Sequence, residues 1–182
     1  MAKLLVTMMG YPGAGKTHFA KQLAEKIDAV VLSSESLRNV LFPDRTEQTT
    51  PEGNVIIFGI MDYAVSQILD TGISVIYDTK TNRRKERQKN ARIARNHGAI
   101  PITVWIQTDK TLTFERTETR EVRLDQIRLT REERVERNSD YLEEPEDSEL
   151  CIIIDGTKPF SDQFESFQTQ LQRLSNHVPR TF

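Results

Sequence analysis

The chain has 182 residues, with 25 Lys and Arg against 27 Asp and Glu, so its formal net charge is -2. This length suffices for one domain with a sizeable core, and the nearly balanced charge argues against a non-specific nucleic-acid binder. Cys151 is the one cysteine, which excludes an intrachain disulfide, and its apolar surroundings predict a buried, inert thiol. No apolar run is long enough to span a membrane and no signal peptide is recognisable, so we expect a cytoplasmic protein.

The first predicted element is a strand over residues 3–9, a nearly continuous apolar run that suits a strand covered on both faces. Residues 16–27 carry apolar side chains in a helical stripe. Between them, residues 10–17 fit the pattern G-x-x-x-x-G-K-[ST] of a phosphate-binding loop, in which glycines let backbone N–H groups approach phosphate oxygens. We expect the whole loop to bind ATP or GTP: Gly10, Tyr11, Pro12, Gly13, Ala14, Gly15, Lys16 and Thr17.

Two side chains of this loop have predicted roles of their own. Lys16 would reach the β- and γ-phosphates, and the Thr17 hydroxyl would coordinate Mg²⁺. The alternative is an ordinary glycine turn between a strand and a helix. The order strand, loop, helix favours the phosphate-binding loop.

The remaining elements alternate along the chain. We predict strands at 29–32, 73–77, 100–106 and 150–154, and helices at 36–41, 51–71, about 83–97, about 109–119 and 161–177. The predicted helix caps are Thr49 for the helix at 51–71, Thr81 or Asn82 for the next, and Thr108 or Asp109 for the fourth. Trp105, within an apolar strand, is expected in the core. Five strands alternating with helices indicate a parallel α/β sheet with right-handed crossovers.

Charge is concentrated in particular segments. Residues 80–95 contain eight Lys and Arg and one acid, whereas residues 132–149 contain nine Asp and Glu. We interpret the basic helix as a solvated face; the alternative, a polynucleotide-binding helix, lacks interleaved aromatic side chains. Arginines interleaved with acids over residues 116–137 predict exposed helices, as in a lid.

Candidate catalytic residues follow the predicted strands, because ligands of such sheets bind beyond the carboxyl ends of the strands. Glu35 could accept the proton of an acceptor hydroxyl, or could be an acid favoured by a helix N-terminus. Arg38, three residues later, could hold a substrate phosphate on the same ligand, or form an ion pair with Glu35.

Asp78 ends the strand at 73–77 and could hold Mg²⁺ through water or bind the acceptor; alternatively it caps the following turn. Arg116 and Arg120 are one helical turn apart and could close over the transferring phosphoryl group as arginine fingers. Arg123 is a further candidate. The alternative for each arginine is a solvated surface side chain.

These motifs resemble the predicted-kinase group of P-loop phosphotransferases, relatives of polynucleotide 5′-kinase and of zeta toxins. The resemblance rests on residues 10–17, 33–38, 78–82 and 116–120 and spans about residues 3–167. It implies a three-layer P-loop fold whose five-stranded parallel sheet has the order 2-3-1-4-5, with a helical lid at about 116–137 in a single kinase domain over 1–182. It also implies that Glu35 stands at the position of the general base, Arg38 at that of the acceptor-orienting arginine, Asp78 on the acceptor side, and Arg120 at that of the lid arginine.

Two departures from the family pattern lie on the acceptor side. Glu35 stands where polynucleotide kinases have Asp, and Lys80 adds a residue between Asp78 and Asn82. The resemblance implies a stand-alone kinase that uses ATP or GTP with Mg²⁺, needs no protein partner or membrane, and phosphorylates a nucleic-acid 5′-hydroxyl. A small-molecule acceptor (a nucleoside, nucleotide sugar or antibiotic) is one alternative. A nucleotide-dependent binding switch with little phosphotransfer is another.

Overall fold

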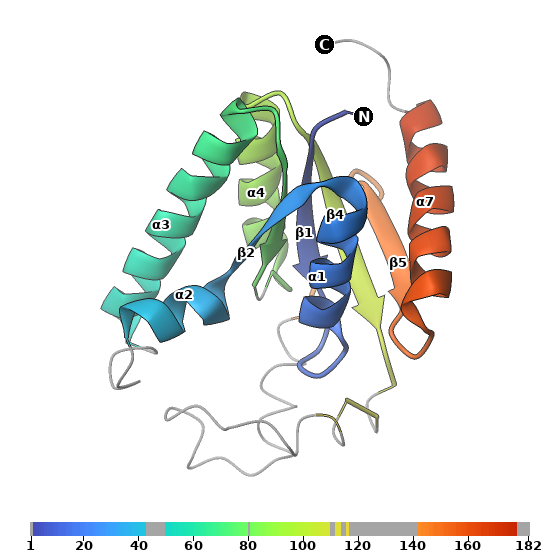
Figure 1. Ribbon diagram of the computed structural model, residues 1–182, viewed down its shortest axis with the longest axis horizontal. Coiled ribbons are helices and arrows are strands. Elements are labelled where there is room, and N and C mark those ends of the chain that lie inside the picture. Colours follow the sequence, from blue (N-terminus) through green and yellow to red (C-terminus); the bar gives the residue numbers. More distant parts are fainter. Residues whose placement is uncertain are drawn as a thin grey trace.

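The strands form one parallel sheet. The computed structural model describes residues 2–42, 50–79, 81–109, 112–113, 116 and 142–177. The five strands of the sheet lie in the order β2-β3-β1-β4-β5, which confirms the predicted fold class and strand order (Figure 1). Their bounds are β1 (Leu4–Met9), β2 (Ala29–Ser33), β3 (Ser74–Asp78), β4 (Ile100–Gln107) and β5 (Cys151–Asp155).

Helices cover both faces of this sheet. They are α1 (Lys16–Ile27), α2 (Ser34–Leu41), α3 (Pro51–Asp70), α4 (Arg84–Asn96) and α7 (Phe160–His177). One face packs against α1 and α7, and the other against α3 and α4, which gives the three layers seen in Figure 1. The predicted helix at about 109–119 and the predicted lid lie almost entirely outside the described residues.

Strand β1 shows why the apolar run predicts a doubly covered strand. All six of its residues are buried. Leu4, Val6 and Met8 belong to the core beneath α1 and α7, whereas Leu5 belongs to the core beneath α3 and α4. Thr7 is the polar member of this run, and its hydroxyl accepts a hydrogen bond at 3.3 Å from the buried Asn90 amide of α4.

Two helix N-termini differ from the predictions, α2 in its first residue and α3 in its capping residue. Helix α2 begins at Ser34 instead of residue 36, because the Ser33 hydroxyl caps it by accepting from the Ser36 N–H. Helix α3 is capped by Thr50, so the prediction of Thr49 was wrong: the Thr50 hydroxyl accepts from the Gly53 N–H at 3.0 Å. Pro51 occupies the first turn of α3, as the sequence predicts.

The start of α4 corrects a third prediction. Neither Thr81 nor Asn82 caps this helix; the N-cap is Arg83. The reason is that both side chains turn toward the first strand and the loop after it: Thr81 donates to the Met8 carbonyl, and Asn82 accepts from the Gly10 N–H. A carboxylate satisfies the first N–H group of the helix instead: the Arg84 N–H donates to the Glu143 carboxylate at 2.6 Å.

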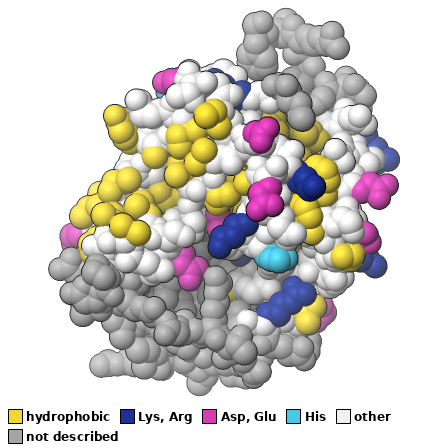
Figure 2. All heavy atoms as spheres, viewed as in Figure 1, with side chains coloured by type: hydrophobic (Ala, Val, Ile, Leu, Met, Phe, Trp, Pro, Cys, Tyr) yellow, Lys and Arg dark blue, Asp and Glu magenta, His cyan; other side chains and the backbone are white. Residues whose placement is uncertain are grey.

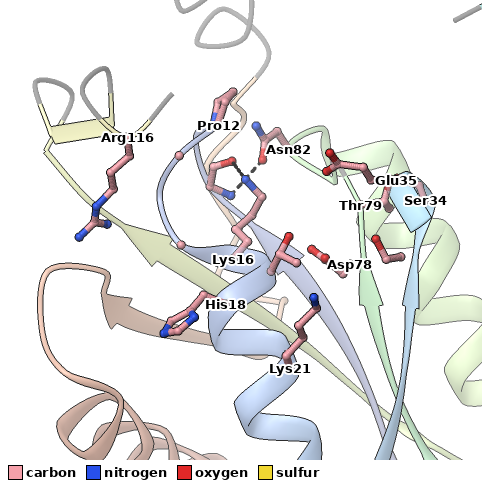
Figure 3. Close-up of a pocket in the computed structure, with 15 residues that line it drawn as sticks. Pro12, Lys16, His18, Lys21, Ser34, Glu35, Asp78, Thr79, Asn82 and Arg116 are labelled. Carbon is pink, nitrogen blue, oxygen red and sulfur yellow. Dashed lines mark hydrogen bonds between the residues drawn. The ribbon is translucent and has the colours of Figure 1, made fainter. Parts of the chain in front are cut away.

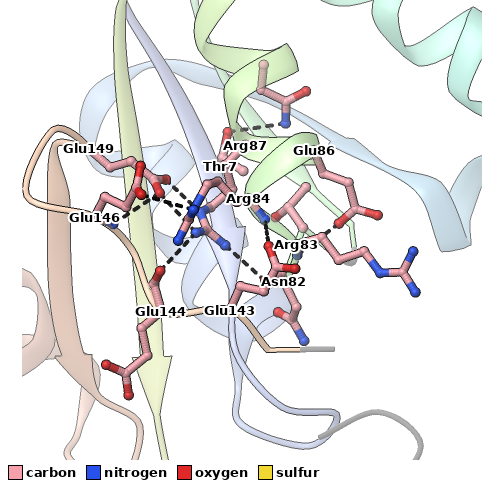
Figure 4. A network of polar contacts seen from close by, with 12 residues as sticks. Thr7, Asn82, Arg83, Arg84, Glu86, Arg87, Glu143, Glu144, Glu146 and Glu149 are labelled. Carbon is pink, nitrogen blue, oxygen red and sulfur yellow. Dashed lines mark hydrogen bonds and ion pairs between the residues drawn. The ribbon is translucent and has the colours of Figure 1, made fainter. Parts of the chain in front are cut away.

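The basic and acidic segments pair with each other (Figure 4). Arg87 is only 2% exposed, which contradicts a fully solvated basic helix. Its Nε and Nη2 donate to the Glu149 carboxylate at 2.6 and 3.0 Å, and its Nη1 donates to the Asn82 carbonyl at 2.9 Å. Arg84 forms a second ion pair with Glu146 at 2.9 Å. Residues 142–149 therefore lie against the N-terminal end of α4 and neutralise part of its charge.

Strand β5 is an edge strand whose outer side is occupied by side chains of α7. Gln170 both accepts from the Ile153 N–H and donates to the Ile153 carbonyl, at 3.0 and 2.7 Å. Gln163 donates to the Asp155 carbonyl at 2.9 Å. These amides satisfy backbone groups that an open edge would offer to another chain.

Two predictions about buried side chains have different outcomes. Trp105 is half-buried, so the prediction that it lies in the core was wrong. It pairs in register with Ile153 of β5, whose side chain is 46% exposed. Among the described elements, no helix covers this part of the sheet face. Cys151 is half-buried, and burial raises the pKa of its thiol to about 11, in keeping with an inert cysteine. Among the described helices, none has the length and apolarity needed to cross a membrane.

Candidate active site

The loop between β1 and α1 has the backbone of a phosphate cradle. Gly10, Gly13 and Gly15 have φ values of 137°, 80° and 102°, which side chains rarely permit. Gly10 is also confined by its neighbours, because a Cβ there would lie 2.4 Å from the Ile106 carbonyl oxygen. Such a succession of unusual backbone angles turns N–H groups toward an anion, at the N-terminus of a helix whose dipole favours negative charge.

This loop is fixed by segments from three other parts of the chain. The Gly10 N–H donates to Asn82 Oδ1 at 3.1 Å. On the other side, the Thr108 hydroxyl donates to the Ala14 carbonyl at 3.0 Å. Gly156 packs beside that bond so closely that a Cβ would lie 2.5 Å from the Ala14 oxygen. The loop is therefore held in place by the segments that follow β3, β4 and β5.

The loop opens on a cavity of about 440 Å³ at the carboxyl ends of the strands (Figure 3). The described residues that line it come from the loop, α1, the end of β2, α2, the end of β3 with the segment after it, and the first residue of the predicted lid: Gly10, Pro12, Gly13, Gly15, Lys16, Thr17, His18, Lys21, Ser33, Ser34, Glu35, Asp78, Thr79, Asn82 and Arg116. The cavity thus joins positive side chains to two carboxylates.

Lys16 lies in the middle of this cavity. Its ammonium group donates to the Gly10 and Tyr11 carbonyl oxygens at 2.9 and 2.8 Å, so the side chain folds back over its own loop. This geometry places a positive charge where phosphate oxygens held by the loop would lie. Thr17 follows it on the first turn of α1 and also lines the cavity.

Two predicted carboxylates face the loop across the cavity. Asp78 ends β3, is 5% exposed, and pairs in register with Ser33 at the end of β2. Glu35 is exposed on the first turn of α2, directly after β2. The parallel pairing of β2 with β3 therefore brings Glu35 and Asp78 to the same edge as Lys16 (Figure 3).

Arg38 has different surroundings from Glu35. Its guanidinium donates to Asn54 Oδ1 at 2.8 Å and lies 5.8 Å from the centre of the Phe58 ring, both on α3. It is buried, and it is not among the described residues that line the cavity. The structure therefore does not bring Arg38 to the surface that Glu35 offers to a ligand.

Of the predicted lid arginines, Arg116 is the one within the described residues. It lines the cavity on the side away from Asp78 and Glu35 in Figure 3, and its Nη1 donates to the Gly156 carbonyl at 3.2 Å. Arg120, Arg123 and Lys80 lie outside the described residues. Their predicted roles stay predictions.

Comparison with known proteins agrees with this geometry. A protein-family model described as an AAA domain (AAA_33) matches residues 5–145. The chain belongs to this AAA-domain family. The match covers the phosphate-binding loop, both carboxylates and Arg116. A search of the curated proteins found no match.

Solved structures with the same fold include kinases. A sugar kinase from Janibacter sp. HTCC2649 has a TM-score of 0.69 and 17% identity, covering 93% of this chain and 95% of its own. A gluconokinase from Sinorhizobium meliloti 1021 has a TM-score of 0.66 and 16% identity, with coverages of 96% and 94%. The Mycobacterium tuberculosis APS kinase in complex with AMPPNP and APS has a TM-score of 0.68 and 16% identity, with coverages of 94% and 98%. At this identity the likeness establishes the P-loop kinase fold.

Several residues of this family member line the cavity without having been predicted as site residues. Lys21 lies one helical turn after Thr17, so its spacing along α1 could have identified it. His18 shares a hydrogen bond with Gln22 at 2.8 Å. The sequence marks Asn82 as a possible helix cap and as the last residue of the 78–82 motif, with no predicted contact to the loop. Asn82 and Gly10 are 72 residues apart in the sequence, and no local sequence pattern predicts a contact over that separation.

Proposed function

We propose that the chain is a kinase that transfers the γ-phosphoryl group of ATP or GTP to a hydroxyl acceptor. One observation carries the proposal: a phosphate cradle fixed by the segments after three strands opens on a cavity whose opposite wall carries Glu35 and Asp78. Phosphoryl transfer needs positioning and charge neutralisation more than covalent chemistry. The described residues supply these two requirements.

The donor half of the reaction rests on the loop. Backbone N–H groups of Gly13 and Gly15 and of the first turn of α1 would hold the β- and γ-phosphates. Pro12 has no N–H, and the N–H groups of Gly10 and Ala14 donate to Asn82 and to the Tyr11 carbonyl. Lys16 would exchange its present carbonyl partners, Gly10 and Tyr11, for phosphate oxygens. Lys21 and Arg116 add positive charge to the same cavity.

The residues present fit Mg²⁺. A magnesium ion in such a site takes one or two protein oxygens and fills its shell with water and phosphate oxygens. The Thr17 hydroxyl and the Asp78 carboxylate, which line one cavity, provide that donor set, and the described residues include no cluster of three His, Cys, Asp or Glu that would suit a protein-caged metal. When bound, Mg²⁺ would neutralise charge on the phosphates.

The acceptor half rests on Glu35. Its carboxylate is exposed on the first turn of α2 and faces the cavity. It would take the proton of the acceptor hydroxyl as that oxygen forms a bond to the γ-phosphorus and the bond to the leaving diphosphate breaks. Asp78, which is more deeply buried, would orient the acceptor or support the metal.

The acceptor we favour is a small molecule with a hydroxyl group. The basic run of α4, which suggested a polynucleotide, is partly neutralised by Glu146 and Glu149. The names of two structural neighbours, a gluconokinase and an APS kinase, also refer to small molecules. The resemblance to polynucleotide 5′-kinase keeps a nucleic-acid 5′-hydroxyl as the second candidate.

The test is a transfer assay with γ-labelled ATP and Mg²⁺. The acceptor panel would contain sugars and sugar acids, nucleosides, nucleotide sugars and oligonucleotides with a 5′-hydroxyl. Label on a small molecule, at a rate nearly independent of salt, is the expected result. Label on oligonucleotides, with a rate that falls steeply as salt rises, would support the second candidate instead. Tight ATP binding without transfer to any acceptor would contradict a kinase and favour a nucleotide-dependent switch.

A further inference from the structure

Helix α3 carries large apolar side chains on its outer side. Figure 2 shows apolar side chains gathered over the region of α3. The end of the neighbouring helix α2 adds two more. We call these residues the α3 surface, and their exposed fractions lie between 39% and 76%: Val40, Leu41, Val55, Ile56, Ile60 and Tyr63. Side chains of this size are usually exposed singly, and a contiguous group marks an interaction site.

The positions on α3 form one continuous stripe. Val55, Ile56, Gly59, Ile60 and Tyr63 recur at i, i+1, i+4, i+5 and i+8, and all five are exposed. The opposite side of the helix is equally apolar and belongs to the core. A helix that is apolar all round is normally covered all round. Within the part of the chain that the structure describes, half of α3 lacks the cover that its composition predicts.

Gly59 is the second anomaly of this helix. It lies in the interior of α3, where glycine lowers helix stability relative to alanine. A Cβ built at Gly59 meets nothing within 4 Å, so packing among the described residues gives no reason for a glycine here. A residue without a side chain at the centre of an apolar helix face lets a second helix approach closely.

We propose that the α3 surface is the interface of a homodimer, in which α3 crosses the α3 of a second copy near Gly59. The exposed apolar area of the α3 surface is on the order of 600 Å². Complete burial of this surface on two copies would remove about 1,200 Å² from water, which is the lower end of the range of specific protein interfaces.

The charge distribution of α3 suits a second copy. A two-fold axis brings the residues beside it close to their own mates, so a charge near the axis would face a like charge. From Gly53 to Met61, α3 contains no charged residue at all. The next residue, Asp62, is half-buried and forms an ion pair with Lys89. A partner recognised through charge would have nothing to bind on this stripe.

The dimer would also affect the helix that carries Glu35. Val40 and Leu41 belong to α2, and Arg38 of the same helix binds Asn54 and Phe58 of α3. An interface over both helices would hold α2 from the outside. The cavity lies at the strand ends and would stay open, since none of the six residues of the α3 surface lines it.

The experiment is to measure mass in solution by light scattering and sedimentation over a concentration series. The full chain should approach twice its monomer mass of 21.0 kDa. Ile56→Glu should raise the dissociation constant of the dimer at least ~10-fold, because it places two carboxylates near the axis, one helical turn from Gly59. The matched control is Ile153→Glu: its side chain is 46% exposed against 48% for Ile56, and it lies at the far edge of the sheet. This control should remain dimeric.

A full chain that stays monomeric at ~100 µM would overturn the proposal, as would Ile56→Glu with unchanged dimerisation. Gly59→Leu provides an independent variant, since leucine favours the helix while its side chain would separate the two backbones. We expect a higher melting temperature in dilute protein together with weaker dimerisation. An unchanged dissociation constant for Gly59→Leu would contradict the crossing near Gly59.

Discussion

The two halves of the cavity are built in different ways. On the donor side, the loop is held by Asn82, Thr108 and Gly156, so its shape is fixed before any ligand binds. On the acceptor side, Glu35 is exposed on the first turn of a short helix, and Arg38 of that helix turns toward α3. The fold therefore fixes the shape of the loop that would hold the phosphate donor, whereas the proposed acceptor side leaves room for different hydroxyl substrates.

The largest loss of stability should follow from Gly10→Ala. The new Cβ would lie 2.4 Å from the Ile106 carbonyl oxygen, and φ is 137°. Backbone strain and overpacking each cost about 1–3 kcal/mol, so the free energy of unfolding should fall by roughly 2–6 kcal/mol. Urea unfolding gives this value, and calorimetric titration should show loss of ATP binding.

Gly59→Ala is the matched control for that substitution. A Cβ at Gly59 meets nothing, and φ is not positive, so in dilute protein the free energy of unfolding should rise by about 0.5–1 kcal/mol. Equal effects of the two substitutions would contradict a rigid donor half.

The difference between the two halves also explains what the sequence could predict. The residues of the donor loop are contiguous in the sequence, so the spacing of Gly10, Gly15 and Lys16 was enough to predict the loop. Asn82, Thr108 and Gly156 reach the loop only through the parallel sheet, and their contacts have no local signature. Thr81 and Asn82 have the chemistry of helix caps, and tertiary contacts with β1 and the loop outweighed that local preference.

The acceptor side was harder to predict for a related reason. Helical spacing of three residues suggested that Glu35 and Arg38 would share one ligand. The direction of Arg38 depends on Asn54 and Phe58, which belong to another helix. In the same way, the basic and acidic segments were visible in the sequence, but their pairing through Arg87 and Glu149 required the fold.

A smaller loss should follow from Glu149→Gln, which breaks the ion pair behind the donor loop. Arg87 is buried and also binds the Asn82 carbonyl, so removing its carboxylate leaves a poorly compensated charge next to the residue that holds Gly10. The free energy of unfolding should fall by about 2–3 kcal/mol. Glu146→Gln is the matched control: its pair with Arg84 has 45% of each side chain exposed and should contribute less than about 0.5 kcal/mol.

The same pair predicts a dependence on pH. Burial by itself raises the pKa of Glu149, but hydrogen bonds from Arg87 and from the Glu146 N–H, with the Arg87 charge, bring it below the ordinary 4.5. A lowered pKa in the folded state stabilises the fold above pH 4.5, and this contribution disappears as the pH falls through the folded-state value. The stability difference between wild type and Glu149→Gln should therefore shrink below pH 4.5; a constant difference would contradict this assignment.

The smallest effect on stability should follow from Glu35→Gln, because this side chain is exposed. The free energy of unfolding should change by less than about 0.5 kcal/mol, whereas kcat should fall about 10²–10⁴-fold if Glu35 is the general base. Arg38→Met should show the reverse: lower stability, since Arg38 is buried against α3, and a smaller change in kcat. Unchanged kcat in Glu35→Gln would remove Glu35 from the mechanism.

The central claim is that the loop around Lys16 holds the phosphoryl donor, and transfer of label from γ-labelled ATP by Lys16→Ala tests it most directly. Lys16 is half-buried, and its present hydrogen bonds are to carbonyls of its own loop, so unfolding by urea should change little. We expect transfer to every acceptor to be abolished while the fold stays intact. Retained transfer in a folded Lys16→Ala variant would contradict the account.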